Sequence, residues 1–396
     1  MLFITLALLP ACGRKAPAKP PTAAPPAQAS VSAAPIAVDW PGLGRKVFFD
    51  TSLSNPPGQS CASCHDPETA FSDPKHRAVS PGAVRGAQGT RNAPTVLYAA
   101  HVPRFGLDPD DDALPPAPEG DAYAQEVRED SLPLQKTGGL FVDGRADSLE
   151  AQAAGPLLNP LEMNHADAAA FAARLRAAPY AQAFTDLIGP DALATPESAM
   201  RWAAAALAAF ERGPSLSPFA SRYDGFLAGK AGLNAQEREG LDVFQNPQRG
   251  NCASCHPNRP LPYDTCPPLF SDHSYHNLGW PLLPGAKPDA GLAAITGDPK
   301  DQGQFRTPTL RNSEKTAHYF HDGRFRTLRE VVDFYADRPT GKFGPAAFPG
   351  TVETRRTGNL KMTEAEREAL VAFLKTLDDL PASLPAQTLE DARQNP

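Results

Sequence analysis

Helical patterning dominates the chain. Residues 166–188 and 198–212 are rich in alanine, and residues 234–245 form a third predicted helix. A fourth helix is predicted to begin at the capping box Thr363-Glu364-Ala365-Glu366 and to end near residue 377. One face of this helix carries Leu370, Phe373, Leu374 and Leu377. Strand signals are few, so the pattern predicts an all-α fold.

The first 38 residues have a different composition from the rest. Residues 1–12 are an apolar run that ends at Cys12 and is too short to span a bilayer. Its last four residues resemble a bacterial lipoprotein box, in which the cysteine is lipidated, and a plain cleaved signal is the alternative. Residues 13–38 are rich in Ala and Pro and predict a flexible linker. Both interpretations imply export, so we expect a periplasmic protein that Cys12 attaches to the membrane if it is lipidated.

Length and charge limit the remaining possibilities. The chain of 396 residues is long enough for two domains, which we expect at residues 39–225 and 226–396. The formal net charge of -7 argues against a nucleic-acid partner, because such proteins are usually basic.

Four of the six cysteines lie in two matching motifs. Cys61-Ala62-Ser63-Cys64-His65 and Cys252-Ala253-Ser254-Cys255-His256 both have the pattern CxxCH, which is typical of c-type haem attachment. Each thiol forms a thioether to one vinyl group, and the following imidazole becomes the proximal iron ligand. A thioredoxin-like CxxC would need a βαβ pattern, and a four-cysteine zinc site would not need His after each pair. The motifs therefore predict two covalent haems.

The two halves share more than CxxCH. Residues 91–97 correspond to residues 306–312, and Asp143-Gly144-Arg145 corresponds to Asp322-Gly323-Arg324. Residues 105–137, rich in Asp, Pro and Glu, are an insertion in the first half. The repeat predicts two all-α, cytochrome c-like domains, each with one covalent haem c.

The repeat also shows a difference between the halves. Tyr335 lies 13 residues after Asp322, whereas Pro156 lies 13 residues after Asp143. If the helix after each Asp-Gly-Arg covers the distal face of a haem, a phenol faces one iron and a proline faces the other. A phenolate can ligate iron and proline cannot. The first haem is therefore predicted to be open and the second to be closed.

Separated stretches in a fixed order resemble the bacterial di-haem cytochrome c peroxidase family, particularly its MauG-like branch, over roughly residues 39–380. They are CASCHDPETAFSD, RNAPTVLYAA, DGRADSLEAQAAGPLLNPLEM, RTPTLRN, YFHDGRF and TLREVVDFY. The resemblance implies an enzyme whose N-terminal haem reacts with hydrogen peroxide and whose C-terminal haem manages electrons. It makes His65 and His256 the proximal ligands.

The resemblance implies roles for residues above the first haem. The distal Gln, Pro and Glu of the family fall on Gln152, Pro156 and Glu162. Glu162 would act as general acid–base on peroxide, and Gln152 would orient it. Some family members place a His over the resting first haem, and Ala83 occupies that position here. The open site is favoured, and His76 is the alternative ligand.

Further ligands follow from the same resemblance. Tyr335 falls on the sixth-ligand position of the second haem, where MauG has Tyr and the peroxidases have Met, and Met362 is the alternative. A calcium ion is implied between the domains, bound by the Asn92 side chain and by the backbone carbonyls of Thr316 and His318. The family's charge-relaying Trp before the first Asp-Gly-Arg is replaced by Val142, which leaves the route of charge between the haems open.

The resulting hypothesis is a peroxide-dependent di-haem oxidoreductase. Its reductant is either a small redox protein, a cytochrome c or cupredoxin, or a side chain of a protein substrate. The alternative is a non-catalytic di-haem electron carrier, which Val142 favours and which Gln152 and Glu162 oppose. Cys266 has no assigned role, and a free thiol is favoured over a disulfide to Cys12 if Cys12 is lipidated. Structural or surface roles are expected for His101, His165, His273 and His276.

Overall fold

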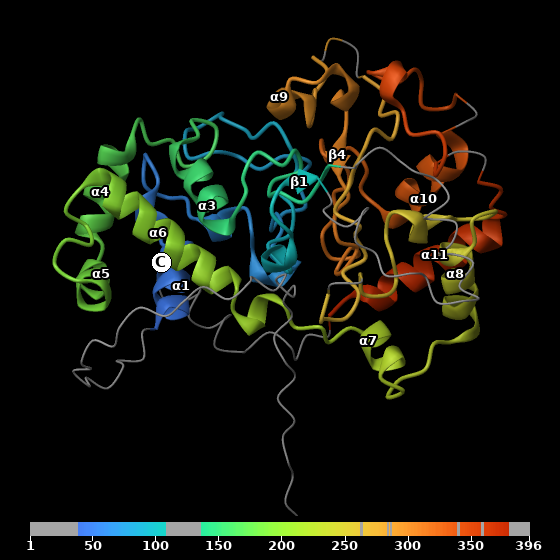
Figure 1. Ribbon diagram of the computed structural model, residues 1–396, viewed down its shortest axis with the longest axis horizontal. Helices are drawn as coiled ribbons and strands as arrows, with labels where there is room; N and C mark the ends of the chain where they lie inside the picture. The colour runs from blue at the N-terminus through green and yellow to red at the C-terminus, as the bar shows by residue number, and fades with distance from the viewer. Residues whose placement is uncertain are drawn as a thin grey trace, which may run out of the picture.

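The computed structural model describes residues 39–107, 136–261, 264–282, 285, 287–338, 341–357 and 360–379. The predictions for residues 1–12, including Cys12, for the linker 13–38, and for most of the insertion fall outside these ranges. Figure 1 shows two helical lobes side by side, the N-terminal lobe in blue to green and the C-terminal lobe in yellow to red. Within the described ranges, no helix has the length and apolar character needed to cross a membrane.

The N-terminal lobe is built from five described helices. They are α1 (Trp40–Phe49), α3 (Leu149–Leu158), α4 (Ala168–Ala177), α5 (Ala181–Ile188) and α6 (Pro196–Glu211). The single helix predicted at 166–188 is in fact two, α4 and α5, because Pro179 cannot continue a helix and the chain turns there. The predicted helix at 198–212 is confirmed as α6, which starts at a capping box between Thr195 and Ser198.

The C-terminal lobe repeats this helical character. Its described helices are α7 (Arg222–Leu227), α8 (Ala235–Gln245), α9 (Ala293–Thr296), α10 (Leu328–Asp337) and α11 (Glu364–Leu374). The predicted helices at 234–245 and 363–377 are confirmed as α8 and as α11 followed by a 3-10 turn. The predicted capping box of Thr363 and Glu366 is present at the start of α11.

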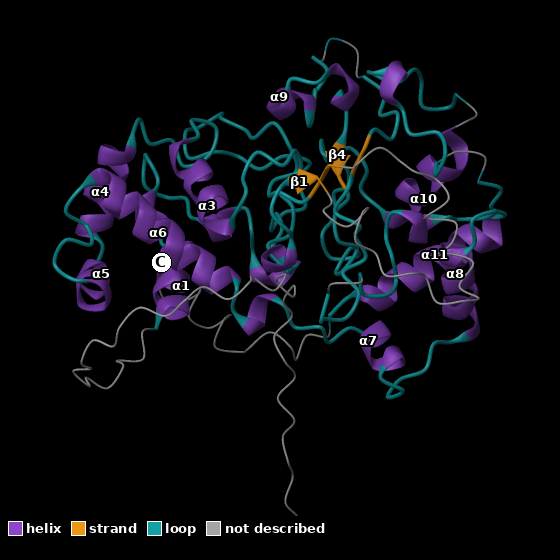
Figure 2. Cartoon of the chain, viewed as in Figure 1, coloured by secondary structure: helices purple, strands orange, loops and turns teal. Residues whose placement is uncertain are grey.

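The described strands are short and lie where the lobes meet (Figure 2). β1 (Gly106–Leu107) pairs antiparallel with β2 (Lys136–Thr137), and β3 (Tyr275–His276) pairs antiparallel with β4 (Phe305–Arg306). Each strand has two residues, so the prediction of few strands is confirmed. The strands join loops at the lobe boundary and add no separate sheet layer.

One close helix crossing recurs in both lobes. α1 crosses α6 so tightly that a Cβ added to Gly44 would lie 1.8 Å from the carbonyl oxygen of Ala206. α8 crosses α11 in the same way, because a Cβ added to Gly240 would lie 2.0 Å from the carbonyl oxygen of Ala369. Only glycine permits backbones to approach this closely. The sequence repeat is thus accompanied by the same helix crossing in both lobes.

A buried polar network joins the lobes. The Tyr98 hydroxyl from the N-terminal lobe donates to Asp379 Oδ2 at 2.6 Å, and Asn312 Nδ2 donates to the same oxygen at 2.6 Å. Arg311, which is 1% exposed, binds Asp224 of α7 through two hydrogen bonds of 2.8 and 2.9 Å. The predicted domain boundary between residues 225 and 226 falls inside α7 and stays a prediction.

Cys266 lies in the N-terminal core although it follows the second CxxCH motif. It is 4% exposed and packs with the apolar cluster of the first lobe. It is disulfide-bonded, so the expectation of a free thiol is wrong.

Candidate haem sites

One large cavity extends through both lobes. Its volume is about 970 Å³, and both CxxCH motifs contribute to its wall. His65 lies at one end and His256 at the other, in equivalent settings within the two lobes. The cavity therefore brings together the residues that the sequence predicts to attach two haems.

Each motif histidine is oriented by a backbone carbonyl. His65 Nδ1 donates to the Phe71 carbonyl at 3.1 Å, and His256 Nδ1 donates to the Phe270 carbonyl at 2.8 Å. This bond fixes the tautomer, so that Nε2 keeps its lone pair for the cavity side. Burial lowers the pKa of both imidazoles and keeps them neutral, as a metal ligand must be.

The carbonyls that orient these histidines sit on matching strained turns. Phe71 has φ +57° and Phe270 has φ +53°, which is rare for a non-glycine residue. A threonine braces each turn, since Thr95 Oγ1 donates to the Ala70 carbonyl and Thr309 Oγ1 to the Leu269 carbonyl, both at 2.6 Å. Strain of this kind persists only where the surroundings impose it, which is common at functional sites.

The four motif cysteines are free to react. Cys61, Cys64, Cys252 and Cys255 all lie in the cavity wall, and none of the four forms a disulfide. Burial is the largest cause that raises the pKa of Cys61 and of Cys252 to about 12, so both stay as thiols. A thiol pair beside a neutral, oriented imidazole at each end of a largely apolar cavity fits a c-type haem on chemical grounds.

The first end of the cavity carries the predicted distal residues. Gln152 and Pro156 of α3 and the nearby Glu162 all line it. The Glu162 carboxylate accepts a 2.7 Å hydrogen bond from Asn159 Nδ2, and the Glu162 amide donates to the Asn159 carbonyl at 3.0 Å. Burial raises the pKa of Glu162, although the hydrogen bond from Asn159 and the charge of Arg145 oppose the rise. A carboxyl group shifted in this direction is suited to proton transfer near neutral pH.

Asn159 is a functional candidate that the sequence prediction missed. It ends α3 and fixes the turn that returns Glu162 to the cavity, because its Oδ1 accepts from the Leu161 amide at 3.0 Å. The sequence does contain a signal for this role. An Asn that directly follows a predicted helix favours a turn, and this one lies three residues before the acid.

The loop that contains Ala83 packs behind Glu162. The Ala83 amide donates to the Glu162 carbonyl at 2.8 Å, and a Cβ on Gly82 would lie 2.3 Å from the Leu161 carbonyl oxygen. Ala83 has no ligating atom. His76, the alternative ligand, is exposed, donates from Nδ1 to the Ala317 carbonyl at 3.0 Å, and does not line the cavity.

The second end of the cavity is covered by α10. Tyr335 projects into it, and Met362 also lines it. Burial raises the pKa of Tyr335, and the nearby Cys255 and Cys252 add to the rise. No described residue makes a hydrogen bond to its hydroxyl, so this oxygen is available to a ligand in the cavity. An iron ion would satisfy that oxygen.

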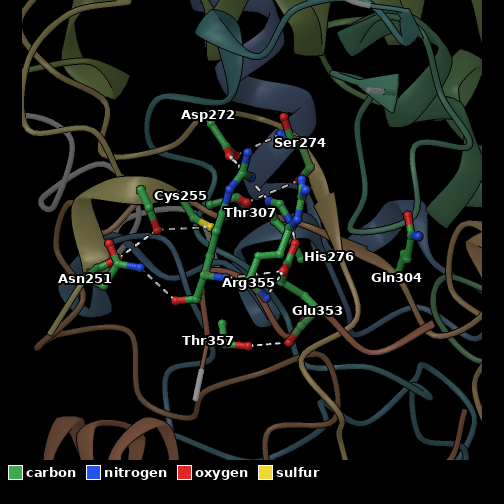
Figure 3. Close-up of polar contacts among 12 residues, drawn as sticks. Asn251, Cys255, Asp272, Ser274, His276, Gln304, Thr307, Glu353, Arg355 and Thr357 are labelled. Carbon is green, nitrogen blue, oxygen red and sulfur yellow. Dashed lines mark hydrogen bonds and ion pairs between the residues drawn. The ribbon is translucent and has the colours of Figure 1, made fainter. Parts of the chain in front are cut away.

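A polar cluster surrounds the second attachment cysteine (Figure 3). His276 Nε2 lies 3.3 Å from Asp272 Oδ2, and His276 Nδ1 lies 3.9 Å from Glu353 Oε2. Burial alone would lower the pKa of His276, but the charges and hydrogen bonds of Cys255 and Asp272 raise it to about 10. Potential ligand atoms of Cys255, Asp272 and His276 lie within 4.8 Å of one another. Of the two expectations for His276, a structural or a surface position, its burial in the cavity wall excludes the surface position.

The residues predicted for calcium all border the same cavity. Asn92, Thr316 and His318 line it, and the Asn92 amide donates to the His321 carbonyl at 2.8 Å across the lobe boundary. Val142 also lines the cavity, and its carbonyl accepts from the Arg306 amide at 2.8 Å. These positions lie where the lobes meet.

Comparison with known proteins decides the family. Residues 40–232 match the family model described as di-haem cytochrome c peroxidase. The methylamine utilization protein MauG of Paracoccus denitrificans is 37% identical over 366 residues, which cover 85% of this chain and 88% of that protein. The chain belongs to the di-haem cytochrome c peroxidase family. The predicted family is therefore confirmed.

Other members agree with this assignment. The cytochrome c551 peroxidase of Nitrosomonas europaea is 29% identical and covers 89% of this chain and 84% of its own length. The crystal structure of the di-haem peroxidase BthA from Burkholderia thailandensis superposes with a TM-score of 0.75 at 34% identity, over 88% of each chain. The predictions of a largely helical di-haem peroxidase fold, of haem as cofactor and of a peroxidase or MauG-type oxidoreductase are confirmed. The chain is thus an enzyme of this family.

Proposed function

We propose that this oxidoreductase divides its work between an open N-terminal haem, which meets hydrogen peroxide, and a closed C-terminal haem. Cys61, Cys64 and His65 would hold the first haem covalently. Cys252, Cys255 and His256 would hold the second, with Tyr335 as its sixth ligand. The observation that carries the proposal is the unequal pair Pro156 and Tyr335, which come from equivalent helices and line opposite ends of one cavity.

At the first end, the chain supplies proton transfer and orientation. When bound, the haem supplies the redox chemistry that splits peroxide. Glu162 takes the proton from one peroxide oxygen and delivers it to the other oxygen as water leaves. Gln152 donates a hydrogen bond that holds peroxide in place, and Asn159 keeps the Glu162 carboxylate aimed at it. Pro156 offers no atom that competes with peroxide for the open position.

At the second end, the phenol of Tyr335 closes the site. A phenolate ligand stabilises the oxidised forms of iron, which favours storage of oxidising equivalents over uptake of electrons from a donor. The reductant is then a small redox protein, a cytochrome c or cupredoxin, or a side chain of a protein substrate. The names of the relatives include both cytochrome c peroxidases and MauG, which supports these two kinds of partner.

The same proposal includes a calcium ion and a cellular compartment. Asn92, Thr316 and His318 border the cavity where the lobes meet, and their oxygens suit a calcium ion there. Covalent haem c attachment and the apolar N-terminal run both favour a periplasmic location.

The decisive experiment compares ferric holoprotein with two tyrosine variants. Tyr335→Phe should convert the second haem from a low-spin to a high-spin signal in electron paramagnetic resonance spectra. Tyr319→Phe is the matched control, because Tyr319 also lines the cavity but its hydroxyl is held by the Ser313 carbonyl at 2.7 Å. An unchanged second-haem signal in Tyr335→Phe would remove Tyr335 as a ligand. If ferric protein shows no high-spin haem and no optical change with peroxide, the chain is an electron carrier instead.

A further inference from the structure

Trp280 lies in the cavity wall but has no role in the proposed function. It is 9% exposed and lines the cavity. Its indole Nε1 donates to Asp322 Oδ2 at 2.9 Å, and its ring stacks on Phe320 with centroids 4.3 Å apart. The indole thus contacts both an aromatic ring and a carboxylate in the wall of the proposed haem cavity. A residue that only fills space in the core does not need this pair of contacts.

Trp280 stands in the middle of a row of rings. On one side, Phe320 lies 6.2 Å from the ring of Tyr335. On the other side, His321 lies 6.0 Å from Trp280 and stacks on Phe305 at 3.9 Å with an interplanar angle of 10°. All five rings line the cavity.

The far end of this row reaches Val142. Phe305 precedes Arg306, whose amide donates to the Val142 carbonyl at 2.8 Å. Val142 has no ring, and its counterpart in the repeat is His321, since each residue directly precedes an Asp-Gly-Arg. The aromatic row therefore extends from the closed end of the cavity to the lobe boundary.

Within this row, Trp280 and Tyr335 are the members that lose an electron most readily. Benzene rings and imidazoles are much harder to oxidise than an indole. The Asp322 carboxylate already accepts the indole proton in a charge-assisted hydrogen bond. The Arg324 guanidinium lies 4.6 Å from the ring and would repel a ring cation, which favours loss of the proton together with the electron.

We propose that Trp280 is a redox-active side chain that gives one electron to the oxidised second haem. The indole Nε1–H bond breaks, its proton passes to Asp322, and a neutral tryptophanyl radical remains. The reductant of the proposed function then returns one electron, and Asp322 returns the proton. The inference rests on that proposed function, because peroxide is the source of the oxidising equivalents.

The test uses the ferric holoprotein, hydrogen peroxide, rapid freezing and electron paramagnetic resonance. Wild-type protein should give a tryptophanyl radical signal whose splitting changes when the indole rings are deuterated. Trp280→Phe should abolish this signal and slow the reduction of the peroxide-oxidised protein by about tenfold or more in stopped-flow absorbance. Trp202→Phe is the matched control, because Trp202 lies on α6 beside Trp40, at 5.7 Å, and does not line the cavity.

A second variant separates chemistry from packing. Asp322→Asn keeps the side-chain size but removes the proton acceptor. It should therefore weaken the radical signal and reduce the solvent isotope effect that wild-type protein should show on formation of the radical. A radical that persists unchanged in Trp280→Phe would overturn the inference while leaving the peroxidase function intact. A wild-type protein that reacts with peroxide but forms no tryptophanyl radical would overturn it as well. A wild-type protein that does not react with peroxide would overturn both.

Discussion

The two ends of the cavity are built alike on their proximal sides. His65 and His256 are each oriented by the carbonyl of a phenylalanine with positive φ. In each lobe two helices cross at a glycine, Gly44 in the first and Gly240 in the second. The same supersecondary unit thus occurs in both lobes, and in each lobe it orients one imidazole toward the haem cavity.

The two ends differ on their distal sides and at one buried position. Pro156 faces the first end and Tyr335 the second, although the helices that carry them are equivalent. Glu211 at the end of α6 matches Leu374 at the end of α11, because the preceding Phe210 and Phe373 both pack against the crossing glycine. The comparison teaches that reactivity depends on a few side chains placed on a common framework.

The largest effect should come from removing the acid at the open end. Glu162→Gln keeps the hydrogen bond to Asn159 but cannot move a proton, so we expect kcat/KM for peroxide to fall by about 10²–10⁴-fold. Steady-state peroxide consumption measures this loss. Glu150→Gln is the control, since Glu150 pairs with Arg212 on the outer side of α3 and should leave the rate nearly unchanged.

The pH profile sharpens the same prediction. Glu162 must be ionised to accept a proton from peroxide, so activity should fall as pH drops through its pKa. Burial raises this pKa, which moves the acid limb above the ordinary range of a glutamate. In Glu162→Gln the acid limb should disappear. An acid limb that persists in this variant would assign the general base to another group.

Because the two lobes share one helix crossing, the same substitution should destabilise both lobes equally. Gly44→Ala and Gly240→Ala should each lower the free energy of unfolding by about 2 kcal/mol, because the new Cβ overlaps a carbonyl of the crossing helix. This cost exceeds the gain in helix propensity of about 1 kcal/mol. Denaturant unfolding followed by circular dichroism measures it. Gly232→Ala is the control, because no atom lies within 4 Å of its added Cβ. If only one of the two variants loses stability, the two helix crossings are not equivalent.

The sequence predicted the attachment motifs and the repeat because both depend on local spacing. It also predicted α6, α8 and α11, whose caps and apolar faces are local signals. It missed the break at Pro179 and the role of Asn159. It could not place His276 in a polar cluster, because Glu353 is far from it in the sequence and is brought to it by tertiary folding. Trp280 escaped notice for the same reason, since its partner Asp322 lies 42 residues away in sequence.

The difference between the two ends can be tested by placing a ligand at the open end of the cavity. Pro156→Tyr places a phenol where the second lobe has Tyr335, and it also restores an amide hydrogen to the middle of α3. If the phenol covers the first iron nine times in ten, the rate of reaction with peroxide should fall by about tenfold. Stopped-flow absorbance and the loss of the high-spin signal measure this. Leu158→Tyr on the exposed side of α3 should change neither.

The last prediction concerns the buried carboxyl at the first end of the cavity. Burial is the first cause that raises the pKa of Glu211 to about 8, well above the value of 4.5 for an exposed glutamate. The folded protein therefore holds a proton that the unfolded chain releases, so stability should decrease as pH rises between these two values. The slope from this one group is about 1.4 kcal/mol per pH unit at most.

Glu211→Leu copies the second lobe, where Leu374 takes this position, and should remove that slope. The measurement is the free energy of unfolding of the wild-type protein and the variant at several pH values from 5 to 8, compared as a difference so that other groups cancel. The variant should gain stability relative to wild type as pH rises. A difference that stays constant with pH would show that Glu211 is ionised in the folded protein, with a positive group beside it. The two ends of the cavity would then differ in charge as well as in ligation.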